Sequence, residues 1–271
     1  MKTAIGRARL DASDGPLLAV VGVFDGLHRG HAWLLGHVVH EARTRRARPA
    51  VITFDAHPDA ILLGHAPPLL MDPAERLERL AALGVEIVVV EHFDDRLRQT
   101  PYDAFIHGIT SRCELAGIVM TPDAAFGHER GGTPTIVAAL GARDGFDVIV
   151  VQPFEIGDRE VRSSEIRSAI AAGDLSTAER LLGRPYAIVG DVYPTGTVAF
   201  AMPVALPPPG TYRVAGAARS ASVAEGGRVT IEPIPARSPL RVEFVGRSSD
   251  AGAESTLPST AAGGESHDIR A

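Results

Sequence analysis

Cysteine and lysine are almost absent from this sequence: Cys113 is the only cysteine and Lys2 the only lysine among 271 residues. A single cysteine excludes an internal disulfide and any metal site built from several thiolates. It fits a reducing compartment, and we expect a cytoplasmic protein. Because arginine carries nearly all of the positive charge, phosphate groups must be bound by guanidinium groups, backbone amides or histidines.

Long apolar runs and blocks of one charge are also missing. No uninterrupted apolar stretch reaches about 20 residues, and the N-terminal segment, with Arg7 and Arg9 followed by Asp11 and Asp14, lacks the apolar core of a signal peptide. Apart from residues 43–48, basic residues are scattered among acidic ones in a chain of net charge −6. We therefore expect small-molecule partners and neither nucleic acid nor a membrane; the sequence does not indicate an oligomeric state.

The regular part of the sequence predicts an α/β fold. From about residue 17, short β-branched runs alternate with helical patterns, which is typical of a parallel sheet flanked by helices. We expect strands at residues 17–24, 50–54, 85–90, 117–120 and 147–151. Helices are expected at residues 30–46, 74–83, 163–171 and 176–182.

The composition changes after residue 185. Val, Thr and Tyr then alternate with polar residues, and Gly and Pro interrupt the pattern at 206–210 and 225–227, which predicts a small β domain. From residue 247 onward, Ser, Gly, Ala, Thr and Glu dominate, so this tail is expected to be disordered. The predicted division is therefore 1–185, 186–246 and 247–271.

Residues 22–31, Gly-Val-Phe-Asp-Gly-Leu-His-Arg-Gly-His, join the first expected strand to the first expected helix. A doubly wound sheet binds ligands at such a junction. Glycines let the backbone approach phosphates, the helix N-terminus offers free amides, and His28 and His31 can donate to phosphoryl oxygens as charge builds. The alternative is a glycine-rich turn with only a conformational role. Most other histidines lack the spacing of metal ligands, so no metal site is expected.

The same segment resembles the signature of the H-x-G-H nucleotidylyltransferase superfamily. Six further stretches extend the likeness over about residues 15–192, and together they resemble the bacterial FAD synthetase family, the riboflavin kinase/FMN adenylyltransferases; they are residues 53–58, 76–80, 84–85, 126–127, 162–167 and 181–186. The resemblance implies a Rossmann-like nucleotidylyltransferase domain. Its implied substrates are ATP, which brings Mg²⁺ with it, and FMN.

The resemblance also implies roles for individual residues. His28 and His31 would contact the ATP phosphates and stabilise the transition state, and Arg167 would clamp the triphosphate. Ser163 and Ser164, at an expected helix start, could donate to the same phosphates or serve only as a helix cap. The predicted nucleotide-binding residues are Gly22, Phe24, Asp25, Gly26, Gly30, Ser163 and Ser164.

The flavin side of the resemblance is less complete. The family pattern Gly-x-Asp-Phe-x-Phe-Gly stands here as Thr-Pro-Asp-Ala-Ala-Phe-Gly at residues 121–127, so Thr121 replaces a glycine and Ala124 an aromatic ring. Losing one large ring could weaken flavin stacking by about 1 kcal/mol. The predicted flavin-binding residues are His57, Pro58, Asp123, Phe126 and Gly127, although His57 could equally be a structural turn residue.

The β domain departs furthest from the family. The Gly-x-Pro-Thr-Ala-Asn segment of the riboflavin kinase barrel is missing between residues 190 and 206, and only residues 206–212 resemble the sequence of that barrel. We therefore expect a degenerate, shortened kinase remnant without kinase activity. The leading hypothesis is an FMN adenylyltransferase; the alternatives are an adenylyltransferase for another phosphorylated acceptor and a non-catalytic flavin or nucleotide sensor.

Overall fold

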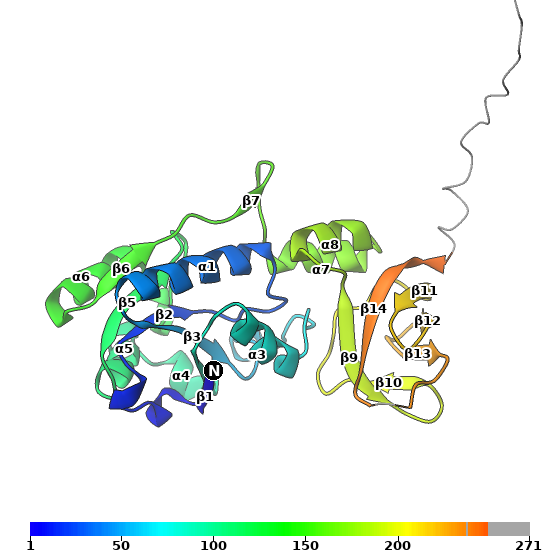
Figure 1. Ribbon diagram of the computed structural model, residues 1–271, viewed down its shortest axis with the longest axis horizontal. Helices are drawn as coiled ribbons and strands as arrows, with labels where there is room; N and C mark the ends of the chain where they lie inside the picture. Colours follow the sequence, from blue (N-terminus) through cyan, green and yellow to red (C-terminus); the bar gives the residue numbers. More distant parts are fainter. Residues whose placement is uncertain (237, 249–271) are drawn as a thin grey trace, which may run out of the picture.

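The computed structural model describes residues 1–236 and 238–248, and Figure 1 shows them as two lobes joined by a pair of helices. The first lobe contains a six-stranded parallel sheet of strand order β1-β4-β3-β2-β5-β6. This arrangement confirms the predicted fold class. The strands are β1 Lys2–Ile5, β2 Leu17–Val21, β3 Arg48–Phe54, β4 Ile87–Glu91, β5 Leu115–Met120 and β6 Asp147–Val150.

Helices cover both faces of this sheet, which explains why its central strands are apolar throughout. One face, with Val20 and Val51, packs on α1 and α3, and the other, with Ala19 and Ile52, packs on α5 and α6. The helices are α1 Arg29–Thr44, α2 Asp59–Leu62, α3 Pro73–Ala82, α4 Asp95–Arg98, α5 Tyr102–Thr110, α6 Pro134–Asp144, α7 Ser163–Ala171 and α8 Leu175–Leu182. Short 3-10 turns are η1 Arg7–Arg9, η2 Ala12–Asp14 and η3 His128–Arg130, and a small hairpin pairs β7 Glu155–Ile156 with β8 Arg159–Glu160.

The second lobe is a closed antiparallel barrel of order β10-β13-β12-β11-β14-β9. Arg247 is the last residue of β14, at the position where the disordered tail was predicted to begin; the rest of that predicted tail, from residue 249, lies outside the described residues. The barrel strands are β9 Ala187–Val192, β10 Thr197–Ala199, β11 Gly210–Ala215, β12 Ser220–Val223, β13 Val229–Glu232 and β14 Leu240–Arg247.

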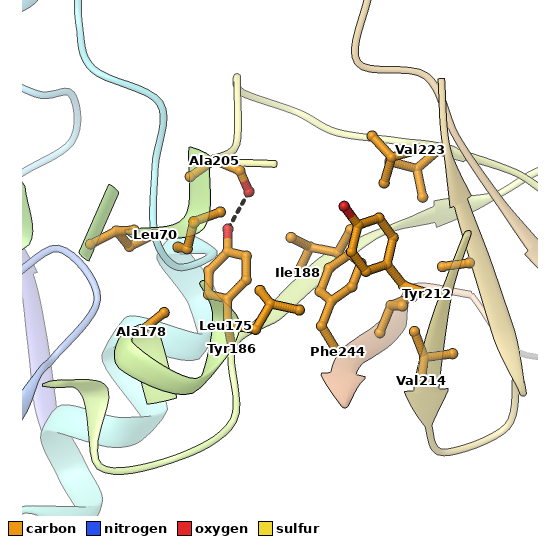
Figure 2. Packing of buried hydrophobic residues seen from close by; sticks show 14 of the residues in the cluster. Leu70, Leu175, Ala178, Tyr186, Ile188, Ala205, Tyr212, Val214, Val223 and Phe244 are labelled. Atoms are coloured by element: carbon orange, nitrogen blue, oxygen red, sulfur yellow. Dashed lines mark hydrogen bonds between the residues drawn. The ribbon is translucent and has the colours of Figure 1, made fainter. Parts of the chain in front are cut away.

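The barrel and the helix pair α7–α8 share one apolar core. Figure 2 shows Tyr186 between Ala178 of α8 on one side and Phe244 of the barrel on the other, and Leu175 of α8 belongs to the same buried cluster. The Tyr186 hydroxyl is buried and donates to the carbonyl oxygen of Ala205. Because α7 also reaches the sheet edge, this shared core connects the barrel to the region where the predicted site lies. Within the described ranges, none of the helices has the length and apolarity needed to span a membrane.

A two-cavity site at the carboxyl edge of the sheet

The segment that follows β2, residues 22–28, is called the cradle below. Strand β2 was predicted to run to residue 24, but it ends at Val21, and the backbone enters the left-handed region at Phe24. Phe24 has φ 54°, Gly26 φ 79° and Leu27 φ 37°. Non-glycine residues in this region cost roughly 1–3 kcal/mol each, so the surrounding structure must hold the cradle in shape.

Side chains from distant elements hold the cradle by its carbonyl groups. The carbonyl oxygen of Val23 accepts hydrogen bonds from the Thr53 hydroxyl at 3.1 Å and from Arg76 at 3.0 Å, and that of Asp25 accepts one from the Ser163 hydroxyl at 3.1 Å. Arg184 donates to the carbonyl oxygens of Gly26 and Leu27. Hydrogen bonds from charged groups contribute about 1.5–3 kcal/mol each, which can offset the backbone strain. Arg76 and Arg184 were not predicted to be part of the site.

His28 closes the cradle and caps helix α1. Its Nδ1 accepts the backbone N–H of His31 at 3.2 Å, so the neutral imidazole carries its proton on Nε2. Burial, assisted by the charges of Arg184 and Arg167, lowers the pKa of His28 to about 4. The side chain is therefore a neutral N–H donor at physiological pH.

His31 stacks on His28 with 3.7 Å between ring centroids and an interplanar angle of 17°. Burial, with a smaller contribution from His28, lowers the pKa of His31 well below its ordinary value. Its Nδ1 is buried and has no hydrogen-bond partner among the described residues. The pair thus presents two neutral imidazoles at the start of a helix, where the free amides and the dipole favour anions.

A cavity of about 360 Å³, called the histidine cavity, opens in front of this pair. Trp33 and the segment 152–154, which the sequence did not single out, form another part of its wall, and the Trp33 indole N–H donates to the Gln152 carbonyl oxygen at 3.1 Å. Of the residues predicted to handle the nucleotide, the structure gathers seven here: Gly22, Phe24, His28, Gly30, His31, Ser163 and Ser164.

A second cavity, of about 740 Å³, lies beside the first and is called the aromatic cavity. Phe54, Phe93 and Phe105 line it, none of which was predicted, and Phe54 and Phe93 pack edge to face. Phe54 ends β3 and Phe93 follows β4, so their positions at the carboxyl ends of neighbouring strands could have indicated them. All five residues predicted to bind flavin line this cavity: His57, Pro58, Asp123, Phe126 and Gly127.

The two cavities share part of their walls. Val21, Gly22, Leu34, Thr121 and Asp123 line both of them. A Cβ atom on Gly22 would lie 3.0 Å from the Phe24 ring, so residue 22 has little room for a side chain. A molecule in one cavity can therefore come close to a molecule in the other at Gly22.

Three of the predicted residues, Asp25, Gly26 and Arg167, line neither cavity. The Arg167 guanidinium donates to the Asp25 carboxylate at 2.5 Å and to the Pro68 carbonyl oxygen at 2.8 Å. The buried Asp25 carboxylate also accepts the Leu70 N–H at 3.0 Å. In this arrangement Arg167 braces the cradle through Asp25, and its role as a phosphate clamp stays a prediction.

Carboxylates are sparse in the histidine cavity. Asp123 and Glu160 line it, and Arg162 donates to both. In the part of the chain that the structure describes, no group of three His, Cys, Asp or Glu side chains could hold a metal ion. A hard cation entering this site would therefore depend largely on oxygens supplied by its ligand.

Comparisons with known proteins agree on one family. Residues 11–165 match the family model for FAD synthetase. The chain is 32% identical over 174 residues to a bifunctional riboflavin kinase/FMN adenylyltransferase of Haemophilus influenzae, and 33% identical over 174 residues to one of Escherichia coli K12. Each alignment covers 64% of this chain and 56% of the relative, so the matched region spans little more than half of the relatives' length.

A solved structure shows the same fold across both lobes. A crystal structure described as a macrolide-efflux protein from Streptococcus pneumoniae matches 91% of this chain and 90% of its own, with a TM-score of 0.75 and 24% identity. At this identity the likeness concerns the fold alone. It includes the barrel, which the sequence comparisons largely leave out.

Proposed function

Because the chain belongs to the FAD synthetase family, we propose that it is an FMN adenylyltransferase, which transfers AMP from ATP to FMN and releases pyrophosphate. One observation carries the proposal: a cavity with two neutral imidazoles adjoins a larger aromatic cavity at Gly22. This is the arrangement that joining a triphosphate to a phosphorylated aromatic acceptor requires.

The histidine cavity suits the ATP phosphates. His28 offers its Nε2 proton, Ser164 offers a hydroxyl, and the start of α7 offers free amides, whereas the Ser163 hydroxyl already donates to the Asp25 carbonyl oxygen. Neutral donors bind polyphosphate without the cost of placing an additional charge in a buried site. Mg²⁺ enters as the ATP complex, bound mainly through phosphate oxygens, since the carboxylates nearby already pair with Arg162.

The aromatic cavity suits an isoalloxazine ring. Phe54, Phe93, Phe105 and Phe126 supply apolar walls against which an aromatic ring can pack. The acceptor phosphate would then lie toward Gly22, where the two cavities meet. The polar rim includes His57, whose Nδ1 accepts the Asp59 N–H at 3.2 Å and whose pKa is lowered by burial.

Adenylyl transfer needs alignment and charge stabilisation more than covalent catalysis. An oxygen of the FMN phosphate attacks the α-phosphorus of ATP, a new P–O bond forms, and the bond to the β-phosphate bridge oxygen breaks to release pyrophosphate. Negative charge develops on the oxygens around the α-phosphorus. The N–H groups of His28 and His31 are fixed in advance to stabilise that charge.

We also propose that the barrel does not phosphorylate riboflavin. The Gly-x-Pro-Thr-Ala-Asn segment is missing, and residues 193–196 form a turn between β9 and β10 instead. Large side chains, among them Tyr186, Tyr212 and Phe244, fill the barrel core (Figure 2). The relatives are described as bifunctional, whereas this chain would retain only the adenylyltransferase half of that activity.

The test uses the purified full chain with ATP, Mg²⁺ and FMN, and follows FAD by chromatography and pyrophosphate by a coupled assay. We expect both products to appear in equal amounts. The His31→Ala variant should lose the activity, whereas His40→Ala, on the exposed side of the same helix, should keep it. Pyrophosphate release with a different phosphorylated acceptor but not with FMN would move the assignment to that acceptor. ATP binding without turnover on any acceptor would contradict enzyme activity.

A further inference from the structure

Arg184 lies at the junction between the two lobes, next to the cradle. Helix α8 ends at Leu182, and Gly183 takes the left-handed conformation, with φ 76°, that reverses the chain. The guanidinium group of Arg184 then reaches back and donates to the carbonyl oxygen of Gly26 at 2.6 Å and to that of Leu27 at 3.2 Å. Among the described residues, it is the only side chain that donates to either carbonyl group.

The two carbonyl groups belong to the peptide units that lead into His28. In a trans peptide, the N–H points opposite to the carbonyl, so fixing these two carbonyls also fixes the N–H groups of Leu27 and His28. Leu27 is held in a left-handed conformation, φ 37°, that it would not choose unaided. Arg184 therefore sets the position of the His28 backbone, and with it the direction of the His28 ring.

The shared core fixes Arg184 in turn. Leu182 and Tyr186, which lie two residues before and two residues after Arg184, are buried in the core that α8 and the barrel form together. Figure 2 shows Tyr186 in this core. The hydroxyl of Tyr186 is anchored on Ala205 of the barrel lobe. Burial lowers the pKa of Arg184 to about 10, so the side chain stays charged at neutral pH.

A second connection runs from the barrel lobe to the same cradle. The backbone of Leu69 pairs with the 203–205 segment, since the Leu69 N–H donates to Pro203 and its carbonyl accepts the Ala205 N–H, each at 2.8 Å. The next residue, Leu70, donates its N–H to the Asp25 carboxylate. The barrel lobe thus supports the cradle from two directions, although it contributes no residue to the lining of either cavity.

We propose that Arg184 is a positioning residue for adenylyl transfer, which holds the peptide units before His28 in place, and that the barrel is retained to keep Arg184 there. The inference rests on the proposed function for its kinetic part. Under this proposal the barrel, which lacks the kinase segment, supports the adenylyltransferase reaction by keeping Arg184 in place.

The test compares Arg184→Met and Arg184→Lys with Arg241→Met. Arg241 is also at the lobe junction, but its ion pairs are with Glu75 and Glu243 rather than with the cradle. For Arg184→Met, measured at a temperature where the variant is folded, we expect kcat for FAD formation to fall about 100-fold, the loss that a displacement of about 1 Å can cause. Lysine can donate to one of the two carbonyl groups, so Arg184→Lys should have an activity between those of the wild type and Arg184→Met. If Arg184→Met does not fold, Arg184→Lys is compared with Arg241→Met instead.

Two further readouts do not depend on FAD formation: the pKa of His28, which reports the Arg184 charge near it, and the binding of MgATP. The Arg184 charge contributes to lowering the pKa of His28, whereas Arg241 is not among the groups that shift it. NMR titration should therefore show a raised His28 pKa in Arg184→Met and an unchanged one in Arg241→Met. Calorimetric titration with MgATP alone should show a Kd raised about tenfold in Arg184→Met only.

The outcomes distinguish the inference from the proposed function. Equal kcat, His28 pKa and MgATP Kd in Arg184→Met and Arg241→Met would overturn the role of Arg184 even if the wild type makes FAD. If the wild type makes no FAD, the proposed function fails, and MgATP binding by Arg184→Met, Arg184→Lys and Arg241→Met still decides whether Arg184 positions the cradle.

Discussion

In the sheet lobe, polar side chains are buried around a strained backbone, whereas the barrel lobe buries an almost wholly apolar core. Asp25, His28, Thr53 and Arg76 are all buried beside the cradle. In the described residues, every non-glycine residue with positive φ precedes residue 131. The polar atoms in the barrel core are tyrosine hydroxyls that donate to nearby carbonyl groups. Strain and buried polarity mark the lobe that contains the proposed site, and uniform apolar packing marks the lobe that contributes no residue to the lining of either cavity.

Shortening a side chain in the barrel core should produce the largest effect, which should be a loss of stability without a loss of activity. Ile231→Ala removes a side chain that is 1% exposed, which should lower the free energy of unfolding by about 2–5 kcal/mol. At temperatures where the variant is folded, kcat for FAD formation should stay within twofold of wild type. Urea denaturation and steady-state kinetics measure the two quantities; a large fall in kcat with unchanged stability would mean that this part of the barrel takes part in the reaction.

The converse variant should remove activity and leave stability intact. In His28→Asn the asparagine can still cap α1, but the Nε2 donor is lost, so kcat should fall about 10²–10³-fold. The matched barrel variant is Tyr193→Ala, an exposed residue in the β9–β10 turn, and it should keep full activity. Equal activity of the two variants would remove the distinction between the lobes.

Acid should weaken the sheet lobe through His28. The pKa of His28 is about 4 in the folded protein and about 6.5 when unfolded, so only the unfolded chain takes up this proton between those values. Stability is therefore lost as pH falls from 6.5 to 4, by about 3 kcal/mol for this group. Urea denaturation at pH 7 and pH 4 should show a smaller loss for His28→Asn than for wild type. An equal loss in both proteins would mean that His28 titrates normally.

The smallest expected effect concerns the two cavities of the sheet lobe and distinguishes which substrate each of them binds. Phe93→Ala removes one aromatic ring from the wall of the aromatic cavity, and packing against such a ring contributes about 0.5–1.5 kcal/mol. KM for FMN should rise several-fold up to about tenfold, while KM for ATP stays unchanged. A rise in KM for ATP, with KM for FMN unchanged, would mean that the assignment of the two cavities is reversed.

Much of the fold followed from the sequence because buried strands and amphipathic helices have strong periodic signals. The central strands and the four expected helices are present, with ends shifted by a few residues. Strand β1 was missed because only Ala4 of its four residues is buried, which leaves no apolar pattern to detect. Helices α5 and α6 were not predicted, although the sequence carries signals of their ends. Pro101 and Pro134 lie at their starts, and Gly145 ends α6 in the left-handed conformation.

The site was predictable where its residues are neighbours in the sequence, and less so where they converge from afar. Residues 22–31 were identified from spacing and resemblance, and half of them line the histidine cavity. Arg76 and Arg184 also lie in stretches that resemble the family, but sequence does not reveal that a side chain donates to a carbonyl group about 50 or 160 residues away. For the same reason, Arg167 was expected to clamp phosphate, whereas the structure pairs it with Asp25.

The most direct test of the account follows two radioactive labels in one reaction series. The full chain is incubated with Mg²⁺ and ATP labelled at the α- or the γ-phosphate, with FMN or riboflavin as acceptor. We expect the α-label to enter the flavin product when FMN is supplied, and the γ-label to enter no flavin with either acceptor. Transfer of the γ-label to riboflavin, or failure of the α-label to reach the flavin, would contradict it.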